Sequence, residues 1–234
     1  MTTIVSLPFK DGVAVLSDTR ATTYDFKEYV SYNKVSEDLG YSLDQDVGVW
    51  VAGAGASTGI ETLFYPFLQY FERKCSEYCV DLNDLKLNQF IELFNNLSAT
   101  YFRTVITSAE LFLSEYCMFL LIVRTRKFLT VLKTSCPVGG LCLNVNPLGE
   151  PTSEDVPNSL FSGVGSGCSY ILGALLLENE KERPLYDWGE EEVLNWAKGY
   201  FQKVITLDLG SNTKNGLNVL FIYKNRKECK KYRI

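Results

Sequence analysis

The order of strand-like and helix-like segments is the sequence feature that most constrains how this chain can fold. The order along the chain is a group of strands, two helices, a second group of strands, two more helices and a last strand. A parallel sheet needs strands and helices in strict alternation, so the observed order favours antiparallel sheets covered by helices. We therefore predict one α+β domain over residues 1–234, a four-layer αββα sandwich of two stacked antiparallel sheets flanked by helices. The strands are predicted at 3–7, 13–17, 47–52, 118–123, 128–132, 141–145 and 219–223.

An Asp-Gly pair, Asp11-Gly12, separates the first two strand-like runs. This pair is a strong hairpin signal, because a type I′ turn needs positive φ at both of its central residues. A turn centred on Asp11-Gly12 brings the start of the chain beside the segment from Asp18 to Ala21. We expect the N-terminus and Asp18 to be close in space.

Apolar side chains at helical spacing locate the helices. Pro66 lies inside the first of these patterns, so it should kink that helix or move its start later. The stretch 147–158 contains three prolines among polar residues and is predicted to be a loop, whereas the basic residues of 224–234 are predicted to form a solvated tail. The helical patterns cover 60–71, 87–97, 170–177 and 193–204.

The absence of histidine restricts the chemistry more than any other aspect of composition. With no histidine in the chain, Ser-His-Asp and Cys-His catalysis and zinc sites that need an imidazole are excluded. A general base must then be a lysine, a carboxylate or the α-amine of the chain. The seven cysteines include no C-x-x-C pair, so neither a disulfide framework nor a thiolate metal cage is indicated. We expect no metal and no cofactor.

Charge and hydropathy exclude several classes of partner. The net charge of −5 gives no reason to expect nucleic acid or a membrane surface. The longest strongly apolar run, 118–123, is much shorter than the ~20 residues that a membrane span needs. Lys10 and Asp11 interrupt the first apolar stretch, so no signal peptide is predicted. We expect a cytoplasmic protein, found also in the nucleus if the source is a eukaryote.

Thr2 is the first candidate nucleophile. A small residue after Met1 favours removal of the methionine, which would expose Thr2 as the N-terminal residue. Such a threonine carries a hydroxyl nucleophile and an amine base on one residue, and the reference pKa of an α-amine is about 7.7–8.0. This chemistry needs no histidine.

A threonine hydroxyl also needs a nearby cation and an oxyanion site. The hairpin brings Asp18 and Arg20 close to the N-terminus, and Lys34 follows after enough residues for one more strand past the same end. A buried lysine held by an aspartate would stay charged and lower the proton affinity of the neighbouring hydroxyl and amine. The glycines of 53–55 would let backbone N–H groups approach an acyl oxygen.

Together these motifs resemble those of the β subunits of the 20S proteasome, which are N-terminal-nucleophile threonine peptidases. Lys34 follows Thr2 at the separation that this family shows, and motifs in matching order extend from residue 2 to about 222. The quoted motifs are Thr2-Thr3-Ile4-Val5, Asp11-Gly12-Val13, Ser17-Asp18-Thr19-Arg20-Ala21-Thr22, the glycine segment at Gly53, Gly165-Ser166-Gly167 and Asp208-x-x-Ser211.

The resemblance implies a role for each matching residue. Thr2 would be the nucleophile, with its α-amine as proton acceptor. Lys34 would tune the hydroxyl, Asp18 would hold Lys34, and Arg20 would support them. The remaining matches imply a hydrogen-bonded shell around the amine from Ser166, Asp208 and Ser211, an oxyanion N–H from Gly53, and a pocket for the residue before the cleaved bond lined by Ala21, Tyr32, Val51 and Gly55.

The activity implied is that of a threonine endopeptidase, a catalytic subunit of a ring protease that cleaves unfolded proteins through an acyl-ester on Thr2. Its partners would be other β-type subunits in stacked, heptameric rings, together with α-type rings and an ATPase unfoldase. Three alternatives remain open: the peptidase subunit of a hexameric-ring bacterial ATP-dependent protease, a transpeptidase on the same fold, and a non-catalytic structural ring subunit.

Overall fold

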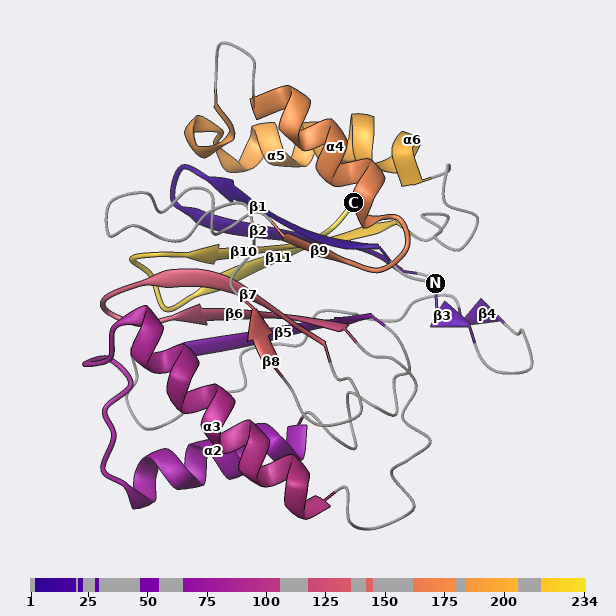
Figure 1. The fold of residues 1–234 in the computed structure, drawn as a ribbon. Coiled ribbons are helices and arrows are strands. Elements are labelled where there is room, and N and C mark those ends of the chain that lie inside the picture. Colours follow the sequence, from indigo (N-terminus) through magenta and orange to yellow (C-terminus); the bar gives the residue numbers. More distant parts are fainter. Residues whose placement is uncertain are drawn as a thin grey trace.

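The computed structural model describes residues 3–19, 21–22, 28–29, 47–54, 65–105, 118–135, 142–144, 162–179, 184–205 and 216–234. In these segments helices are combined with two larger antiparallel sheets and one short strand pair (Figure 1). The short pair consists of β3 (Ala21–Thr22) and β4 (Glu28–Tyr29).

The five-stranded sheet joins the two ends of the sequence. Its central strand, β2, pairs with β1 on one side and with β10 on the other, and all neighbouring strands are antiparallel. In spatial order its strands are β11 (Cys229–Arg233), β10 (Leu217–Tyr223), β2 (Gly12–Asp18), β1 (Ile4–Phe9) and β9 (Ser162–Val164).

The four-stranded sheet is built from the middle of the chain and is also antiparallel. Its strands lie side by side in sequence order, and two of the described helices intervene in the chain between the first and the second of them. They are β5 (Gly48–Ala54), β6 (Met118–Arg124), β7 (Leu129–Ser135) and β8 (Cys142–Asn144).

The helices form two groups, one against each sheet (Figure 1). Pro66 lies in the first turn of α2 as described, where proline is tolerated because its missing N–H has no partner within the helix. Residues 55–64 lie outside the described residues, so the predicted kink or later start stays a prediction. The first group contains α2 (Tyr65–Glu77) and α3 (Leu87–Val105). The second contains α4 (Cys168–Asn179), the 3₁₀ turn η4 (Leu185–Asp187), α5 (Glu190–Trp196), the π-helical turn η5 (Ala197–Phe201) and α6 (Gln202–Ile205).

Three apolar clusters hold these elements together. Because strand side chains alternate between faces, each sheet supplies one set to the space between the sheets and another to its helices. The cluster between the sheets includes Ile4, Val13 and Val15 from one sheet and Trp50, Leu120 and Ile122 from the other. The two outer clusters include Phe67, Phe71, Phe90 and Phe94 of α2 and α3, and Ile171, Leu175, Val193 and Phe201 of the second helical group.

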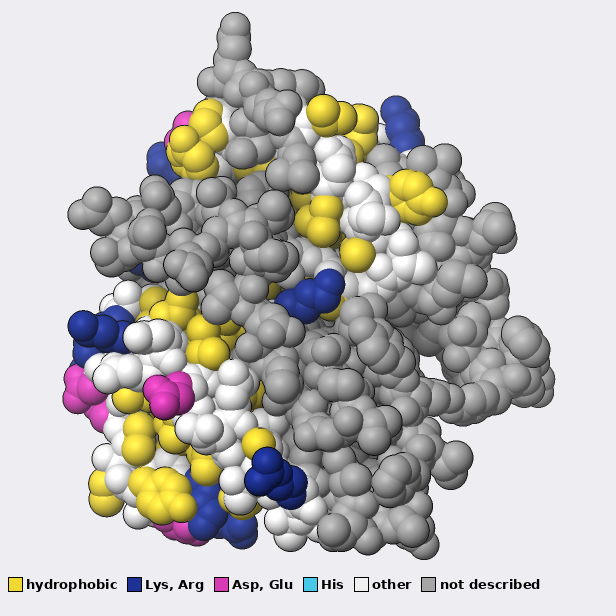
Figure 2. All heavy atoms as spheres, in the orientation of Figure 1, with side chains coloured by type: hydrophobic (Ala, Val, Ile, Leu, Met, Phe, Trp, Pro, Cys, Tyr) yellow, Lys and Arg dark blue, Asp and Glu magenta, His cyan; other side chains and the backbone are white. Residues whose placement is uncertain are grey.

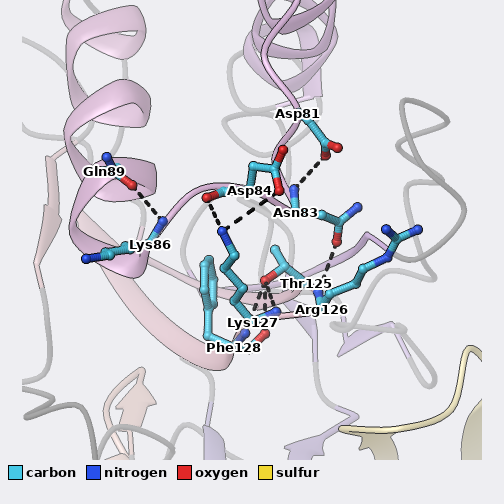
Figure 3. Close-up of polar contacts among 9 residues, drawn as sticks. All are labelled: Asp81, Asn83, Asp84, Lys86, Gln89, Thr125, Arg126, Lys127 and Phe128. Carbon is cyan, nitrogen blue, oxygen red and sulfur yellow. Dashed lines mark hydrogen bonds and ion pairs between the residues drawn. The ribbon is translucent and has the colours of Figure 1, made fainter.

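Polar contacts fasten the loop between α2 and α3 to the turn between β6 and β7 (Figure 3). The Asn83 side-chain oxygen accepts a hydrogen bond from the Arg126 backbone N–H at 3.0 Å. The Lys127 amine donates to the backbone oxygen of Asp84, whose carboxylate is 3.9 Å away. On the face that Figure 2 presents, charged and apolar side chains are mixed over α2 and α3.

The first hairpin forms, but its predicted register is wrong. Phe9 pairs with Gly12, so the turn residues are Lys10 and Asp11, and neither has positive φ. Gly12 belongs instead to β2, where a Cβ atom would lie 2.0 Å from the backbone oxygen of Ile222 in β10. Gly12 is therefore explained by the close approach of two strands and not by a type I′ turn.

The basic residues of the C-terminal segment are exposed, as predicted, but its last part is a strand and not a tail. Cys229–Arg233 form β11, which pairs with β10 from Ile222↔Cys229 to Asn218↔Arg233. The lysines of this strand remain exposed, while Tyr232 packs against the cluster that contains Phe221.

In the described part of the chain, no helix is long and apolar enough to cross a bilayer.

Candidate functional site

The candidate site lies at the end of the five-stranded sheet where β1 begins and β2 ends. Asp18, the last residue of β2, is fully buried. Its carboxylate oxygen Oδ1 accepts a hydrogen bond from the Thr3 backbone N–H at 2.9 Å, and its own N–H donates to the Thr3 oxygen at 3.1 Å. The predicted proximity of Asp18 to the start of the chain is therefore confirmed, at the residue that follows Thr2.

Asp18 is held from its other side by β10. It pairs with Leu217, the first residue of that strand. The next residue, Thr19, donates from its hydroxyl to the Gly216 oxygen at 3.1 Å. Gly216 has φ of +90°, and a Cβ atom there would lie 2.8 Å from the Ile234 oxygen, so a glycine is needed at this position. Both flanking strands thus fix the backbone that carries the carboxylate.

Ser166 is brought to the same end of the sheet. β9 pairs with β1 through Ile4↔Val164, so the turn that follows Val164 lies beyond the first residue of β1. This turn begins with Gly165 at φ of +95° and leads into α4, whose Cys168 N–H donates to the Gly165 oxygen at 3.3 Å. Ser166, in the middle of the turn, is exposed.

The other described candidates belong to neighbouring elements. Gly53 is buried near the end of β5 and pairs with Phe119. Figure 1 shows β5 ending on the side of the molecule where β1 begins. The Val51 side chain is buried in the cluster with α2 and α3, and Ala21 lies in β3 opposite Tyr29.

Seven sequence-predicted residues lie outside the described residues, and their roles stay predictions. They are Thr2, Arg20, Tyr32, Lys34, Gly55, Asp208 and Ser211.

Ser17 belongs to one of the motifs quoted from the sequence, but sequence reasoning assigned it no role. Its side chain is fully buried next to Asp18, and its hydroxyl has no hydrogen-bond partner among the described residues. Val13 and Val15 of the same strand face the space between the sheets, and alternation places Ser17 on that face too. The two-residue period was the signal that could have identified it.

Cys168 also lies near this end, at the start of α4. Burial raises the pKa of its thiol, and the nearby charge of Lys133 opposes that shift only in part. A raised pKa keeps a thiol protonated and therefore weakly nucleophilic. This electrostatic environment does not favour Cys168 as an alternative nucleophile.

Within the described segments, no three carboxylate or thiol groups converge as a metal site would require.

Comparison of the chain with protein-family models and with curated protein sequences finds no match.

Proposed function

We propose that this chain is a threonine endopeptidase of the N-terminal-nucleophile type, acting as a β-type subunit of a proteasome-like ring protease. The observation that carries the proposal is the pair of hydrogen bonds between Thr3 and buried Asp18. These bonds attach the residue after the proposed nucleophile to the carboxylate that the resemblance pairs with Lys34. Thr3 and Asp18 share one end of the sheet with the turn that contains Ser166, which supports the proposal.

The proposal includes the architecture, a single four-layer αββα domain over residues 1–234. Its support is the set of three apolar clusters, one between the sheets and one between each sheet and its helices.

In the proposed reaction the Thr2 hydroxyl attacks a peptide carbonyl while the α-amine of Thr2 accepts the hydroxyl proton. The C–N bond breaks, the leaving amine takes up the proton, and the acyl group remains on Thr2 as an ester. Attack by water releases the acid and restores the hydroxyl. Lys34 would keep the hydroxyl acidic, and Gly53 would donate its N–H to the developing oxyanion.

The position of β5 supports the oxyanion role. Among the described strands, β5 is one of the two edge strands of its sheet. Backbone groups of an edge strand that point away from its neighbour remain available for other partners.

In this proposal the cytoplasm is the compartment, and the partners are further β-type subunits in stacked rings, α-type rings and an ATPase unfoldase.

The test uses intact-mass spectrometry before and after treatment with an α′,β′-epoxyketone peptide, which bridges a threonine hydroxyl and its free α-amine. We expect loss of Met1 and one adduct per chain, mapped to Thr2. The Thr2→Ala variant should form no adduct. Thr100→Ala, which removes an exposed hydroxyl on α3, is the matched control and should react as the parent does.

An N-terminal Thr2 that forms no adduct in the assembled particle would contradict the proposal. If the adduct forms, incubation with a peptide substrate and a second, amine-bearing peptide distinguishes hydrolysis from transfer. Free acid as the product supports the peptidase, whereas a ligated product identifies a transpeptidase.

A further inference from the structure

The contact between Thr3 and Asp18 departs from the pattern of the β1–β2 ladder. In an antiparallel sheet, a hydrogen-bonded pair exchanges two backbone N–H···O bonds. Thr3 and Asp18 continue the register of Ile4↔Ser17, and one bond, from Asp18 N–H to the Thr3 oxygen, is a backbone bond. The Thr3 N–H donates instead to the Asp18 side chain.

The use of a side-chain acceptor in place of a backbone acceptor fixes the orientation of a specific peptide group. The Thr3 N–H belongs to the planar peptide bond that joins Thr2 to Thr3, and the same plane contains the Cα atom of Thr2. A hydrogen bond to an ionised carboxylate is stronger than one to a backbone carbonyl. The contact lies where Asp18 is fully buried, so water does not compete for it.

The carboxylate is itself immobilised by its strand. Asp18 pairs with Leu217 on the side away from Thr3. Next to this pair, the Thr19 hydroxyl donates a hydrogen bond to the backbone oxygen of Gly216. The acceptor is therefore held in place before any substrate binds, as a group that orients a catalytic residue must be.

We propose that Asp18 is a positioning residue that orients the Thr2–Thr3 peptide group, and thereby the N-terminal threonine, through its hydrogen-bond acceptor rather than through its charge alone. This inference rests on the proposed function, because only a reactive Thr2 gives the orientation a catalytic consequence. It assigns Asp18 a second task beside the holding of Lys34.

Two substitutions separate these tasks. Asp18→Asn removes the negative charge but keeps a side-chain carbonyl that can accept the Thr3 N–H. Asp18→Ala removes both the charge and the acceptor. Ser17→Ala is the matched control, because it truncates the neighbouring buried side chain, which has no hydrogen-bond partner among the described residues.

The first readout does not depend on activity. In protein labelled with ¹⁵N-threonine, hydrogen exchange of the Thr3 amide is followed by NMR in each variant. We expect protection within about threefold of the parent in Asp18→Asn and Ser17→Ala, and at least tenfold faster exchange in Asp18→Ala. Equal exchange of the Thr3 amide in Asp18→Asn and Asp18→Ala would overturn the proposal. If Asp18→Ala does not fold, loss of protection in Asp18→Asn overturns it.

The second readout is peptide hydrolysis in the assembled particle. A positioning defect lowers kcat and leaves KM unchanged, since the groups that bind the substrate are intact. We expect kcat of Asp18→Ala to be at least tenfold below that of Asp18→Asn, with equal KM. Equal kcat in the two variants would show that only the charge matters. A protected Thr3 amide in a parent protein that never reacts at Thr2 would defeat the proposed function while leaving the contact intact.

Discussion

Two buried charges of opposite sign lie near opposite ends of β10 and are held in different ways. At one end, Asp18 accepts a hydrogen bond from the Thr3 N–H. At the other end, Arg124 of β6 is buried, lies over the Trp50 ring at 5.1 Å and donates to the backbone oxygen of Arg226, which follows β10. The arginine thus connects the two sheets, whereas the aspartate is bonded within one sheet to the residue that follows Thr2.

The difference indicates which end is structural. A buried charge is costly unless hydrogen bonds and a partner compensate for it. Arg124 gains its compensation from an aromatic face and a carbonyl, so its net effect is to join β6 to the hairpin of β10 and β11. Each end also buries one polar atom without a described partner, the Ser17 hydroxyl and the Trp50 indole N–H, so the bonding of the two charges and not an unpaired atom distinguishes the ends. Four predictions test this contrast.

The largest effect is expected from Gly12→Ala, at the Arg124 end. The new Cβ atom would lie 2.0 Å from the Ile222 oxygen, so β2 and β10 must separate. We expect the free energy of unfolding to fall by about 3 kcal/mol, which is typical of overpacking a rigid contact. Urea denaturation measures it. Gly173→Ala, where no atom lies within 4 Å of the added Cβ, is the control; equal losses in both variants would refute the steric explanation.

Arg124→Leu should cost less, about 2 kcal/mol, because it removes a charged hydrogen bond and a cation–π contact but keeps apolar volume over Trp50. The same denaturation assay measures it, with Arg103→Leu on the exposed part of α3 as the control. In the proposed peptidase the reactivity of Thr2 should be unchanged. A stability equal to that of the parent would show that Arg124 does not join the sheets.

A smaller, pH-dependent effect is expected from Glu190, which contacts Tyr223 and Lys230 of the β10–β11 hairpin near the Arg124 end. Burial opposes ionisation of Glu190, but hydrogen bonds from Tyr223 at 2.5 Å and from Lys230 at 3.0 Å outweigh it and lower the pKa of its carboxyl below the ordinary value of 4.5. A lowered pKa means that this stabilisation is present above the ordinary value and is lost as the pH falls through the lowered one. Melting temperatures between pH 7 and pH 3 should decline less steeply in Glu190→Gln than in the parent. Parallel curves for the two proteins would contradict the assignment.

The smallest effect belongs to the Asp18 end. Ser17→Ala removes a buried hydroxyl without a described partner, so the free energy of unfolding should stay the same or rise by about 0.5–1 kcal/mol. Thermal denaturation measures the change. A loss above about 1 kcal/mol would mean that the hydroxyl has a bonded partner, and the two ends would then differ in this respect, since the Trp50 N–H has no described partner.

Local sequence patterns predicted much of the fold. The apolar pattern from Leu87 to Leu97 predicted α3, because helical periodicity needs no distant information. The register at Gly12 was wrong because the reason for this glycine is Ile222, which lies in a strand far along the chain. β11 was missed because six basic residues after residue 223 suggested solvent, although its pairing with β10 decides its structure.

The candidate site was predictable only in part. A short polar segment between two strand-like runs made the hairpin, and with it the proximity of Asp18 to the N-terminus, predictable, although the turn is not the predicted one. The hydrogen bond from the Thr3 N–H to the Asp18 carboxylate was not predictable from the sequence. It forms where the β1–β2 ladder ends, and the sequence did not show at which residue that is. The roles of Thr2 and Lys34 stay predictions.

The central place of β2 in its sheet also constrains when this protein can fold during synthesis. β2 lies between β1, its neighbour in sequence, and β10, and the hydrogen bond from Thr19 to Gly216 joins residues 197 positions apart. On the ribosome the first hairpin emerges early, with both faces apolar and one edge of β2 unpaired until the C-terminal segment is made. An unpaired apolar strand is prone to aggregate. The first hairpin of this chain therefore needs protection until β10 has been synthesised, so a chaperone that shields β2 should raise the yield of native protein.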